Sequence, residues 1–237
     1  MIILYRSGKL FSMFLFLCFL IAAVLLVLTV RGYRYHPAMQ LDSTPSLVID
    51  PGHGGVDGGA IAFNGVKESD INLSIGQKLR MLAEFLGIRT VMTREDDGAS
   101  KDYSKYSEHD DLVQRTELIN SVPNGILISI HQNFYPTSQP SGAEILYAPG
   151  EKSRMLGENT QRNIVTFLQP GNRRLAGPAS KSLYILTHIS CPGILAECGF
   201  MSNITDLDQL TNDSFQTSLA SVLLVSYLQF VSREVSV

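Results

Sequence analysis

Two histidines and one glutamate of this 237-residue chain lie at positions where they could bind a catalytic metal or act beside it. His53, His131 and Glu197 each follow an apolar run that is typical of a strand, in segments 47–49, 126–130 and 193–196. In open α/β sheets, ligands bind beyond the carboxyl ends of the strands. Imidazole nitrogens and carboxylate oxygens suit zinc, and a catalytic zinc takes three protein ligands and leaves a fourth position for water. The pattern therefore predicts a zinc site that activates water.

The residues alone leave the third zinc ligand open. The candidate carboxylates that follow His53 or precede it closely are Asp50, Asp57, Glu68 and Asp70. Spacing does not choose among them. The remaining histidines lie in segments without strand character, and we interpret them as ordinary surface or loop residues. They are His36, His109 and His188.

Glu197 differs from the other acids because an apolar strand carries it. A carboxylate is seldom buried unless it has an ion-pair partner or a functional role. Partial desolvation raises the pKa of a glutamate towards the range that is useful for a general base. The competing interpretation is a structural ion pair with a nearby arginine such as Arg115. If Glu197 proves structural, Asp57 is the next candidate for the base.

The glycine-rich segment around His53 also resembles a phosphate-binding loop, but its spacing argues against one. Asp57 occupies the position of the third glycine counted from Gly52 and Gly54. No Lys-Ser or Lys-Thr pair follows Gly59. The glycines instead remove side chains that would keep a metal or substrate away from His53.

Strand and helix patterns alternate after residue 46, which predicts a single α/β domain with a mixed, largely parallel sheet of about six strands flanked by helices. Ser69 or Asp70 is the expected cap of the first long helix, and Gly87 is its expected stop. Further strands are predicted at 88–93, 142–147 and 183–186. Further helices are predicted at 111–120, around residues 156–167, and around residues 215–228, where the last one covers a sheet face.

Three further features of the sequence concern a polar segment, the cysteines and the net charge. The polar segment 94–111 is predicted to be a surface excursion or flap. Cys191 and Cys198 are predicted to be free, partly buried thiols, since three cysteines are too few for a disulfide scaffold. A net charge of −3 without a basic cluster argues against a nucleic-acid partner.

The amino-terminal part of the chain indicates a membrane anchor. Residues 10–30 are almost wholly apolar, charges bound the run on both sides, and about 20 such residues span a bilayer. A cleaved secretory signal is the alternative, but its apolar region is usually about 7–15 residues long. We expect a short cytoplasmic segment (1–9), an uncleaved anchor (10–30), a linker (31–45) and a catalytic domain (46–237) outside the cytoplasm.

The chain resembles the zinc-dependent N-acetylmuramoyl-L-alanine amidases of the amidase 3 type over nearly all of residues 47–237. The shared motifs are IDPGHGGVDGGA (49–60), GVKES around Glu68, MTRED (92–96), ISIHQN (128–133) and ILAECGFMSN (194–203). The resemblance implies that His53, Glu68 and His131 are the zinc ligands and that Glu197 is the catalytic acid and base. It also implies a substrate, the amide that joins N-acetylmuramic acid to L-alanine in peptidoglycan, and segment 183–187 is expected to line its groove.

The small size, the anchor, the insertion at 94–111 and the absence of wall-binding repeats make the chain most similar to the spore-cortex (CwlD-type) amidases. Such enzymes strip peptide from muramic acid so that the δ-lactam of cortex peptidoglycan can form. Gln132 and Ala196 depart from the residues that are common in the family, but neither change removes a donor atom from the expected site. The sequence leaves open whether a protein partner loads the zinc or activates the enzyme.

Two other function classes remain as alternatives. A polysaccharide deacetylase would use similar ligands on an acetamide, but such enzymes usually pair two histidines as H-x-x-x-H, and this chain has no such pair. A catalytically inactive wall-binding module is the second alternative, and an intact Glu197 counts against it.

Overall fold

The computed structural model describes residues 45–97 and 106–235 of the chain. The predicted anchor, nearly all of the linker, His36 and part of the polar segment 94–111 lie outside these residues. Residues 45–237 group into one unit by their internal contacts.

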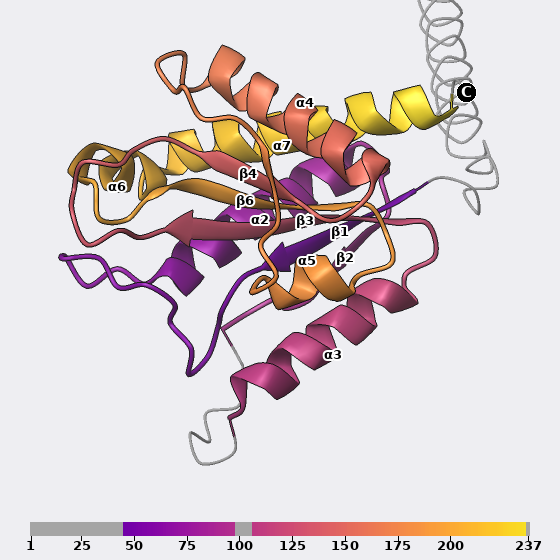
Figure 1. Cartoon of the computed structure of the whole chain (residues 1–237), viewed down its shortest axis with the longest axis horizontal. Coiled ribbons are helices and arrows are strands. Elements are labelled where there is room, and N and C mark those ends of the chain that lie inside the picture. The colour runs from indigo at the N-terminus through magenta and orange to yellow at the C-terminus, as the bar shows by residue number, and fades with distance from the viewer. Residues whose placement is uncertain (1–44, 98–105, 236–237) are drawn as a thin grey trace, which may run out of the picture. The chain divides into compact units, whose positions relative to one another are not determined.

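Six strands among the described residues form one mixed sheet with the order β2-β1-β3-β6-β4-β5 (Figure 1). The strands β1, β2, β3 and β6 run parallel, and β4 pairs with β6 in the antiparallel sense. The predicted fold class is therefore confirmed. The strands are β1 (Ser46–Pro51), β2 (Thr90–Met92), β3 (Gly125–Asn133), β4 (Glu144–Tyr147), β5 (Gly177–Pro178) and β6 (Gly193–Phe200).

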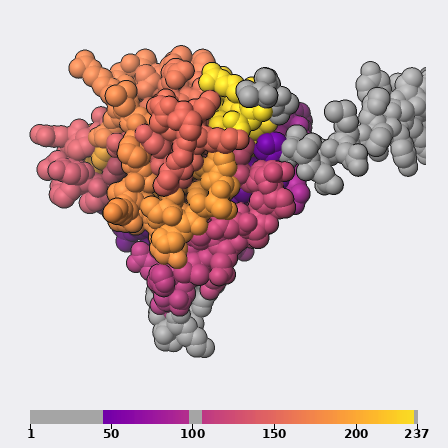
Figure 2. Space-filling view, turned by 45° about the vertical axis from the view of Figure 1, so that its right-hand side comes forward, coloured from indigo at the N-terminus to yellow at the C-terminus, as the bar shows by residue number. Residues whose placement is uncertain are grey.

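Helices cover both faces of the sheet, as the alternation of strand and helix patterns predicts. The contacts of α7 with α2 and α4 place these three helices in one layer, and α3 contacts α5 on the other side (Figure 1). In Figure 2 the magenta surface of α3 borders the orange surface of the segment that carries α5. The helices are α2 (Glu68–Phe85), α3 (Glu108–Ser121), α4 (Glu151–Phe167), α5 (Tyr184–His188), α6 (Ile204–Leu210) and α7 (Asp213–Val235).

Alternating residues of the strands pack into two separate cores, because successive side chains point to opposite faces. Ile194 and Ala196 belong to the larger core, which lies under α2, α4 and α7. Leu195 belongs to the smaller core, which includes Ile185 of α5 and Ile119 of α3. The face of β6 that bears Leu195 is thus the face that also bears Glu197.

The helix α7 is the one helix among the described residues that is long and apolar enough to span a bilayer. Half of its most apolar stretch is buried within the domain. Leu219 and Leu223 of α7 are in the larger core, as predicted for a closing helix. We therefore interpret α7 as a core helix rather than a membrane span.

Most of the predicted helices and strands are present, but one predicted strand is wrong. Residues 183–186 were predicted to be a strand, but Tyr184–His188 forms the helix α5 and Leu183 precedes it. A short apolar run does not distinguish a buried strand from a buried helical turn. Here Ile185 and Leu186 fill the space between α3 and the sheet, where one helical turn suffices. The short elements β5 and α6 were not predicted.

Several boundaries also differ from those predicted. The helix α2 begins at Glu68, because the backbone N–H groups of Glu68 and Ser69 bond to the carbonyls of Ala60 and Gly58 and no side-chain cap is needed. The stop at Gly87 is as predicted, with a φ of 75°. Ser107 caps α3, which therefore begins three residues earlier than predicted. The strands β3 and β6 continue through His131 and Glu197 rather than ending before them.

Candidate metal centre

The loop after β1 places His53 in the left-handed region, with a φ of 61°. Glycines surround His53 in this loop, and at two of these glycines there is no room for a side chain. A Cβ on Gly52 would lie 2.1 Å from Nε2 of His131, and a Cβ on Gly59 would lie 2.6 Å from Oε2 of Glu68. The glycines therefore allow three candidate ligands to converge.

His53, Glu68 and His131 meet at this loop, each with one ligand atom within 4.8 Å of the others. Oε1 of Glu68 lies 3.3 Å from Nε2 of His53 and 3.0 Å from Nδ1 of His131. The two imidazole rings are edge to face, with centroids 4.9 Å apart. Two imidazoles and one carboxylate, drawn from β3, α2 and the loop after β1, fit the donor set of a catalytic zinc.

Glu68 is only 4% exposed, and hydrogen bonds hold its carboxylate in place. Oε1 accepts the backbone N–H of Gln132 at 3.0 Å, and Oε2 accepts that of Ala60 at 3.0 Å. Burial raises the pKa of Glu68, but hydrogen bonds from His131 and His53 outweigh this effect and lower it well below the usual range. Glu68 is thus held as an anion, the form that binds a cation.

His53 is oriented by a second carboxylate. Its Nδ1 lies 2.7 Å from Oδ2 of Asp57, which itself accepts the backbone N–H of Gly59 through Oδ1. Burial lowers the pKa of His53, but hydrogen bonds to Asp57 and Glu68 raise it to about 10. Ligating histidines usually engage a carboxylate through the other ring nitrogen, which fixes the tautomer. Asp57 has the place of such a partner.

The other carboxylates that the sequence left open lie elsewhere. Asp50 is fully buried and accepts hydrogen bonds from Thr93, Ser129 and Arg115. Asp70 is exposed on α2. The geometry therefore brings Glu68, rather than Asp50, Asp57 or Asp70, between the two histidines.

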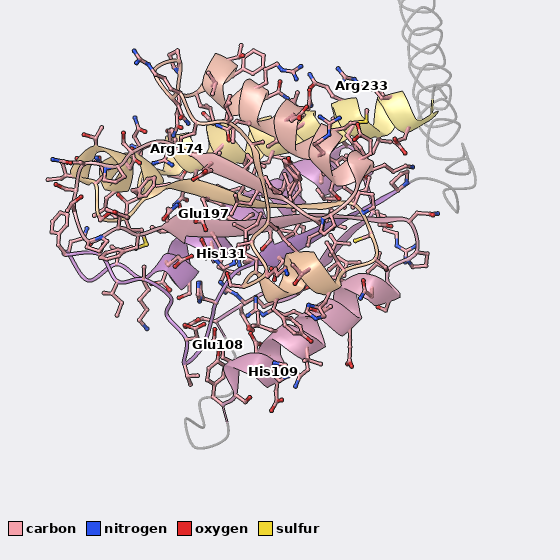
Figure 3. All side chains as sticks on the ribbon, viewed as in Figure 1. Glu108, His109, His131, Arg174, Glu197 and Arg233 are labelled. Carbon is pink, nitrogen blue, oxygen red and sulfur yellow. The ribbon has the colours of Figure 1, made fainter. Side chains whose placement is uncertain are left out.

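Glu197 lies beside the cluster on β6, where it pairs in register with His131 of β3 (Figure 3). Its Oε2 is buried and has no hydrogen-bond partner among the described residues. Burial raises the pKa of Glu197 to about 7, although the neighbouring His131 acts in the opposite direction. A buried carboxylate atom without a partner, next to a candidate metal cluster, suggests a group that receives and returns a proton.

The alternative interpretation of Glu197 as an ion-pair partner of Arg115 is wrong. The guanidinium of Arg115 bonds to Asp50 at 3.1 Å and to Asp111 at 2.7 Å. It also donates to the backbone carbonyl of His53 at 2.6 Å. Arg115 therefore supports the loop of His53 and does not pair with Glu197.

A cavity of about 250 Å³ lies against His53 and His131 of the cluster. The segment expected to line a substrate groove does line this cavity, as the helix α5 and the residue before it. Metal-cluster residues, Glu197 and apolar side chains share the wall, among them His53, His131, Leu112, Leu183, Ile185 and Leu195. The cavity is therefore polar where the histidines and Glu197 line it and apolar where the other side chains line it.

The other described histidines stay apart from the cluster. His109 contacts the ring of Tyr184 edge to face at 5.4 Å, and His188 stacks on the same ring at 3.9 Å. Cys191 and Cys198 are free, as predicted, and Cys198 is fully buried. None of these residues belongs to the candidate metal cluster.

Sequence reasoning missed one arginine of the site. Arg94 was assigned to the surface excursion, yet its guanidinium donates to the carbonyls of Pro51, Gly52 and Ser69 at 2.8, 3.0 and 2.8 Å. It thereby connects the end of β1 to the start of α2. Arg94 lies in the shared motif MTRED, but the motif does not name its partners.

The chain is similar to known proteins over most of its length. Residues 47–225 match the family model described as N-acetylmuramoyl-L-alanine amidase. The germination-specific N-acetylmuramoyl-L-alanine amidase of Bacillus subtilis is 31% identical over 198 residues, which cover 79% of this chain and 80% of that protein. A sporulation-specific amidase of the same organism is 29% identical over 177 residues, covering 73% and 63%.

Solved structures are similar as well. The CwlD amidase of Clostridioides difficile, determined in complex with the GerS lipoprotein, has a TM-score of 0.74 at 30% identity, covering 79% of this chain and 98% of that one. The amidase AmiC2 of Nostoc punctiforme has a TM-score of 0.69 at 28% identity, covering 79% and 97%. The chain therefore belongs to the N-acetylmuramoyl-L-alanine amidase family.

Proposed function

We propose that this chain is a zinc-dependent amidase that hydrolyses the amide between N-acetylmuramic acid and L-alanine in peptidoglycan. The observation that carries the proposal is the cluster of His53, Glu68 and His131 beside the buried, unpaired carboxylate of Glu197. Family membership supports the substrate class.

The metal would be held by His53, Glu68 and His131. Zinc in such a site supplies a Lewis acid that polarises a carbonyl and makes water a better nucleophile near neutral pH. Asp57 would hold the ring of His53 in one orientation, and the N–H groups of Gln132 and Ala60 would hold the carboxylate of Glu68.

Glu197 would move the proton in both halves of the reaction. It first takes a proton from the water that attacks the carbonyl carbon of the lactyl group. The bond between that carbon and the amide nitrogen then breaks, and Glu197 gives its proton to the departing nitrogen. A pKa raised to about 7 suits a group that must accept and return a proton near neutral pH. The products are the free lactyl carboxylic acid and a peptide with a free L-alanine amine.

The biological setting is a further part of the proposal. Germination-specific and sporulation-specific amidases are among the relatives, which supports action on spore-cortex peptidoglycan before muramic δ-lactam forms. We place the catalytic domain, residues 46–237, outside the cytoplasm behind an anchor at residues 10–30. The CwlD amidase was solved together with a lipoprotein, so a protein partner that activates or zinc-loads this chain is proposed as well.

The decisive experiment is mass analysis of purified peptidoglycan after incubation with the detergent-solubilised full chain, with zinc and with a chelator. Release of stem peptides with a free alanine amine, dependent on zinc, is expected. Loss of acetate instead would identify a deacetylase. No change in the presence of zinc would favour an inactive wall-binding module.

Variants in the same assay separate metal binding from chemistry. His53→Ala and His131→Ala should lose stoichiometric zinc by elemental analysis, whereas the matched control His188→Ala should keep it. Glu197→Gln should keep its zinc while turnover falls by about 10²–10⁴-fold. Full zinc in His53→Ala would overturn the ligand assignment, and loss of zinc in Glu197→Gln would make Glu197 a ligand.

A further inference from the structure

Three ionisable side chains form a row across neighbouring strands at the site. His131 of β3 pairs in register with Glu197 of β6, and Glu197 pairs in register with Glu144 of β4. Side chains that are paired in register lie on the same face of a sheet. Neighbouring strands are about 4.8 Å apart, so Glu144 stands beside Glu197 on the side away from the metal cluster.

The packing on this face supports the same arrangement. Leu195, two residues before Glu197, belongs to the smaller core, and Leu146, two residues after Glu144, packs against it. Because side chains alternate along a strand, Glu197 and Glu144 project on this same side. Figure 3 shows Glu197 with His131 on one side of it and Arg174 on the other.

Arg174 holds Glu144 in a defined position. Its Nη1 lies 3.0 Å from Oε2 of Glu144, and its Nε donates to the backbone carbonyl of Ser141 at 3.1 Å. The guanidinium also covers the ring of Phe200, 4.6 Å from its centroid. The side chains of Arg174 and Glu144 are both 30% exposed, so the Glu144 carboxylate remains open to solvent.

The reaction described above does not use Glu144. It is not in the candidate metal cluster, and it does not bond to the unpaired Oε2 of Glu197. A partly exposed ion pair contributes little to stability. We therefore expect the Glu144 carboxylate to bind a ligand.

The products of the reaction supply a ligand for it. When the amide is cleaved, the nitrogen takes one proton from Glu197 and becomes the free amine of L-alanine. An α-amine has a pKa of about 7.7–8.0, so at neutral pH it takes a second proton from water and becomes an ammonium group. This cation arises next to Glu197, which is one strand spacing from Glu144.

We propose that Glu144, held by Arg174, is the subsite that receives the amino group of the leaving stem peptide. This inference rests on the proposed amidase function and names the side of the site from which the peptide departs. Glu144 binds the ammonium by a charge-assisted hydrogen bond, and Arg174 acts as a positioning residue that keeps the carboxylate in one orientation.

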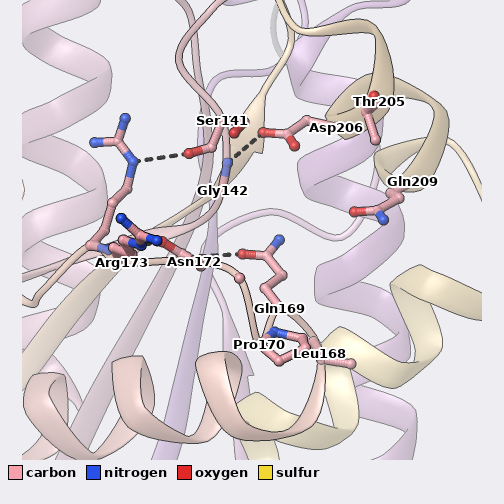
Figure 4. A pocket seen from close by; sticks show the side chains of 12 residues that line it. Ser141, Gly142, Leu168, Gln169, Pro170, Asn172, Arg173, Thr205, Asp206 and Gln209 are labelled. Atoms are coloured by element: carbon pink, nitrogen blue, oxygen red, sulfur yellow. Dashed lines mark hydrogen bonds between the residues drawn. The ribbon is translucent and has the colours of Figure 1, made fainter.

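A cavity lies beside Arg174, the ion-pair partner of Glu144. This cavity of about 590 Å³ begins at Ser141 and Gly142, the latter two residues before Glu144, and runs between the loop after α4 and the helix α6 (Figure 4). Its wall is polar and carries Arg173 and Arg174.

Calorimetric titration of the zinc-loaded full chain with two matched peptides tests the subsite. The first peptide is L-alanyl-γ-D-glutamate with its free amine, and the second is the same dipeptide acetylated on that amine. The parent should bind the free amine more tightly. Glu144→Gln should weaken binding of the free amine by about tenfold or more, since a hydrogen bond to a charged group is worth about 1.5–3 kcal/mol, and leave the acetylated peptide unchanged.

Glu151→Gln is the matched control, because Glu151 is an exposed glutamate of α4 that pairs with Arg154 away from this row. It should bind both peptides as the parent does. Equal affinity of Glu144→Gln and the parent for the free amine would overturn the proposal, and so would an equal loss for both peptides. Failure of the proposed function appears separately, as a parent that releases no peptide from peptidoglycan.

Discussion

Burial makes Glu197 suitable for proton transfer and at the same time costly to the fold. Its Oε2 has no partner among the described residues, and the pKa of the carboxyl is raised to about 7. The same desolvation that tunes the group for catalysis penalises its ionised form. Functional residues of this kind commonly reduce stability at the pH at which they work.

The destabilisation of the fold by Glu197 depends on pH. The pKa of Glu197 is raised from 4.5 to about 7 in the folded chain, so the folded state binds more protons than the unfolded state between these values. The group therefore penalises folding increasingly as pH rises through this window, and Glu197→Gln removes the penalty. Relative to the parent, the free energy of unfolding of Glu197→Gln should rise by about 2–3 kcal/mol between pH 5 and pH 8.

Urea unfolding of the chelator-treated proteins at the two pH values measures this difference. Chelation is needed because a cation beside Glu197 would favour its ionised form. A stability difference that is the same at both pH values would show that Glu197 is not desolvated in the folded chain.

At the scale of elements, the site depends on how the end of β1 is joined to the start of α2. The first carries His53 in its loop and the second carries Glu68. Arg94 donates to carbonyls of both segments, and Arg115 donates to the carbonyl of His53 from the other side. These bonds fix the distance between two candidate ligands before any metal binds.

Arg94→Lys should therefore weaken zinc binding without unfolding the chain. A lysine keeps the charge but lacks the fork that reaches three carbonyls at once. Loss of a group that supports metal ligands typically costs about 10–100-fold in metal affinity. Competition with a chromophoric chelator measures the affinity. Arg80→Lys is the control, because the partners of Arg80 among the described residues are Glu84, Glu95 and the sulfur of Met92, away from the candidate ligands.

If Arg94→Lys binds zinc as tightly as the parent, the carbonyl contacts of Arg94 do not organise the site. A loss of affinity in Arg80→Lys of the same size would attribute the effect to general destabilisation. Thermal unfolding of both variants without metal distinguishes these cases.

At the scale of the whole molecule, the candidate catalytic unit is preceded by a segment that we expect to be an uncleaved anchor. The apolar run 10–30 has the length of a bilayer span, and charged residues bound it on both sides. Protein from cells should therefore partition with membranes and keep its original amino terminus. Membrane fractionation followed by amino-terminal sequencing tests this, with a chain lacking residues 10–30 as the soluble control. A mature terminus near Arg31 would identify a cleaved signal.

The sequence by itself determined the fold class, the glycine loop around His53 and the strands that carry His131 and Glu197. These features follow from local rules, since glycine frees the backbone and apolar runs of strand length are buried in sheets. The same rules misplaced residues 183–186, because a short apolar run satisfies a helix and a strand equally well.

Residue spacing left the third carboxylate open and the resemblance implied Glu68, but only the tertiary structure places Glu68 between the two histidines and shows which residues surround them. Glu68 is separated from His131 by 63 positions, and Arg94 from Gly52 by 42. Glu144 faces Glu197 because β4 and β6 pair in one antiparallel register, and a shift of one residue would turn it to the other face. Strand register and side-chain direction arise from pairing between distant segments, so no local pattern specifies them.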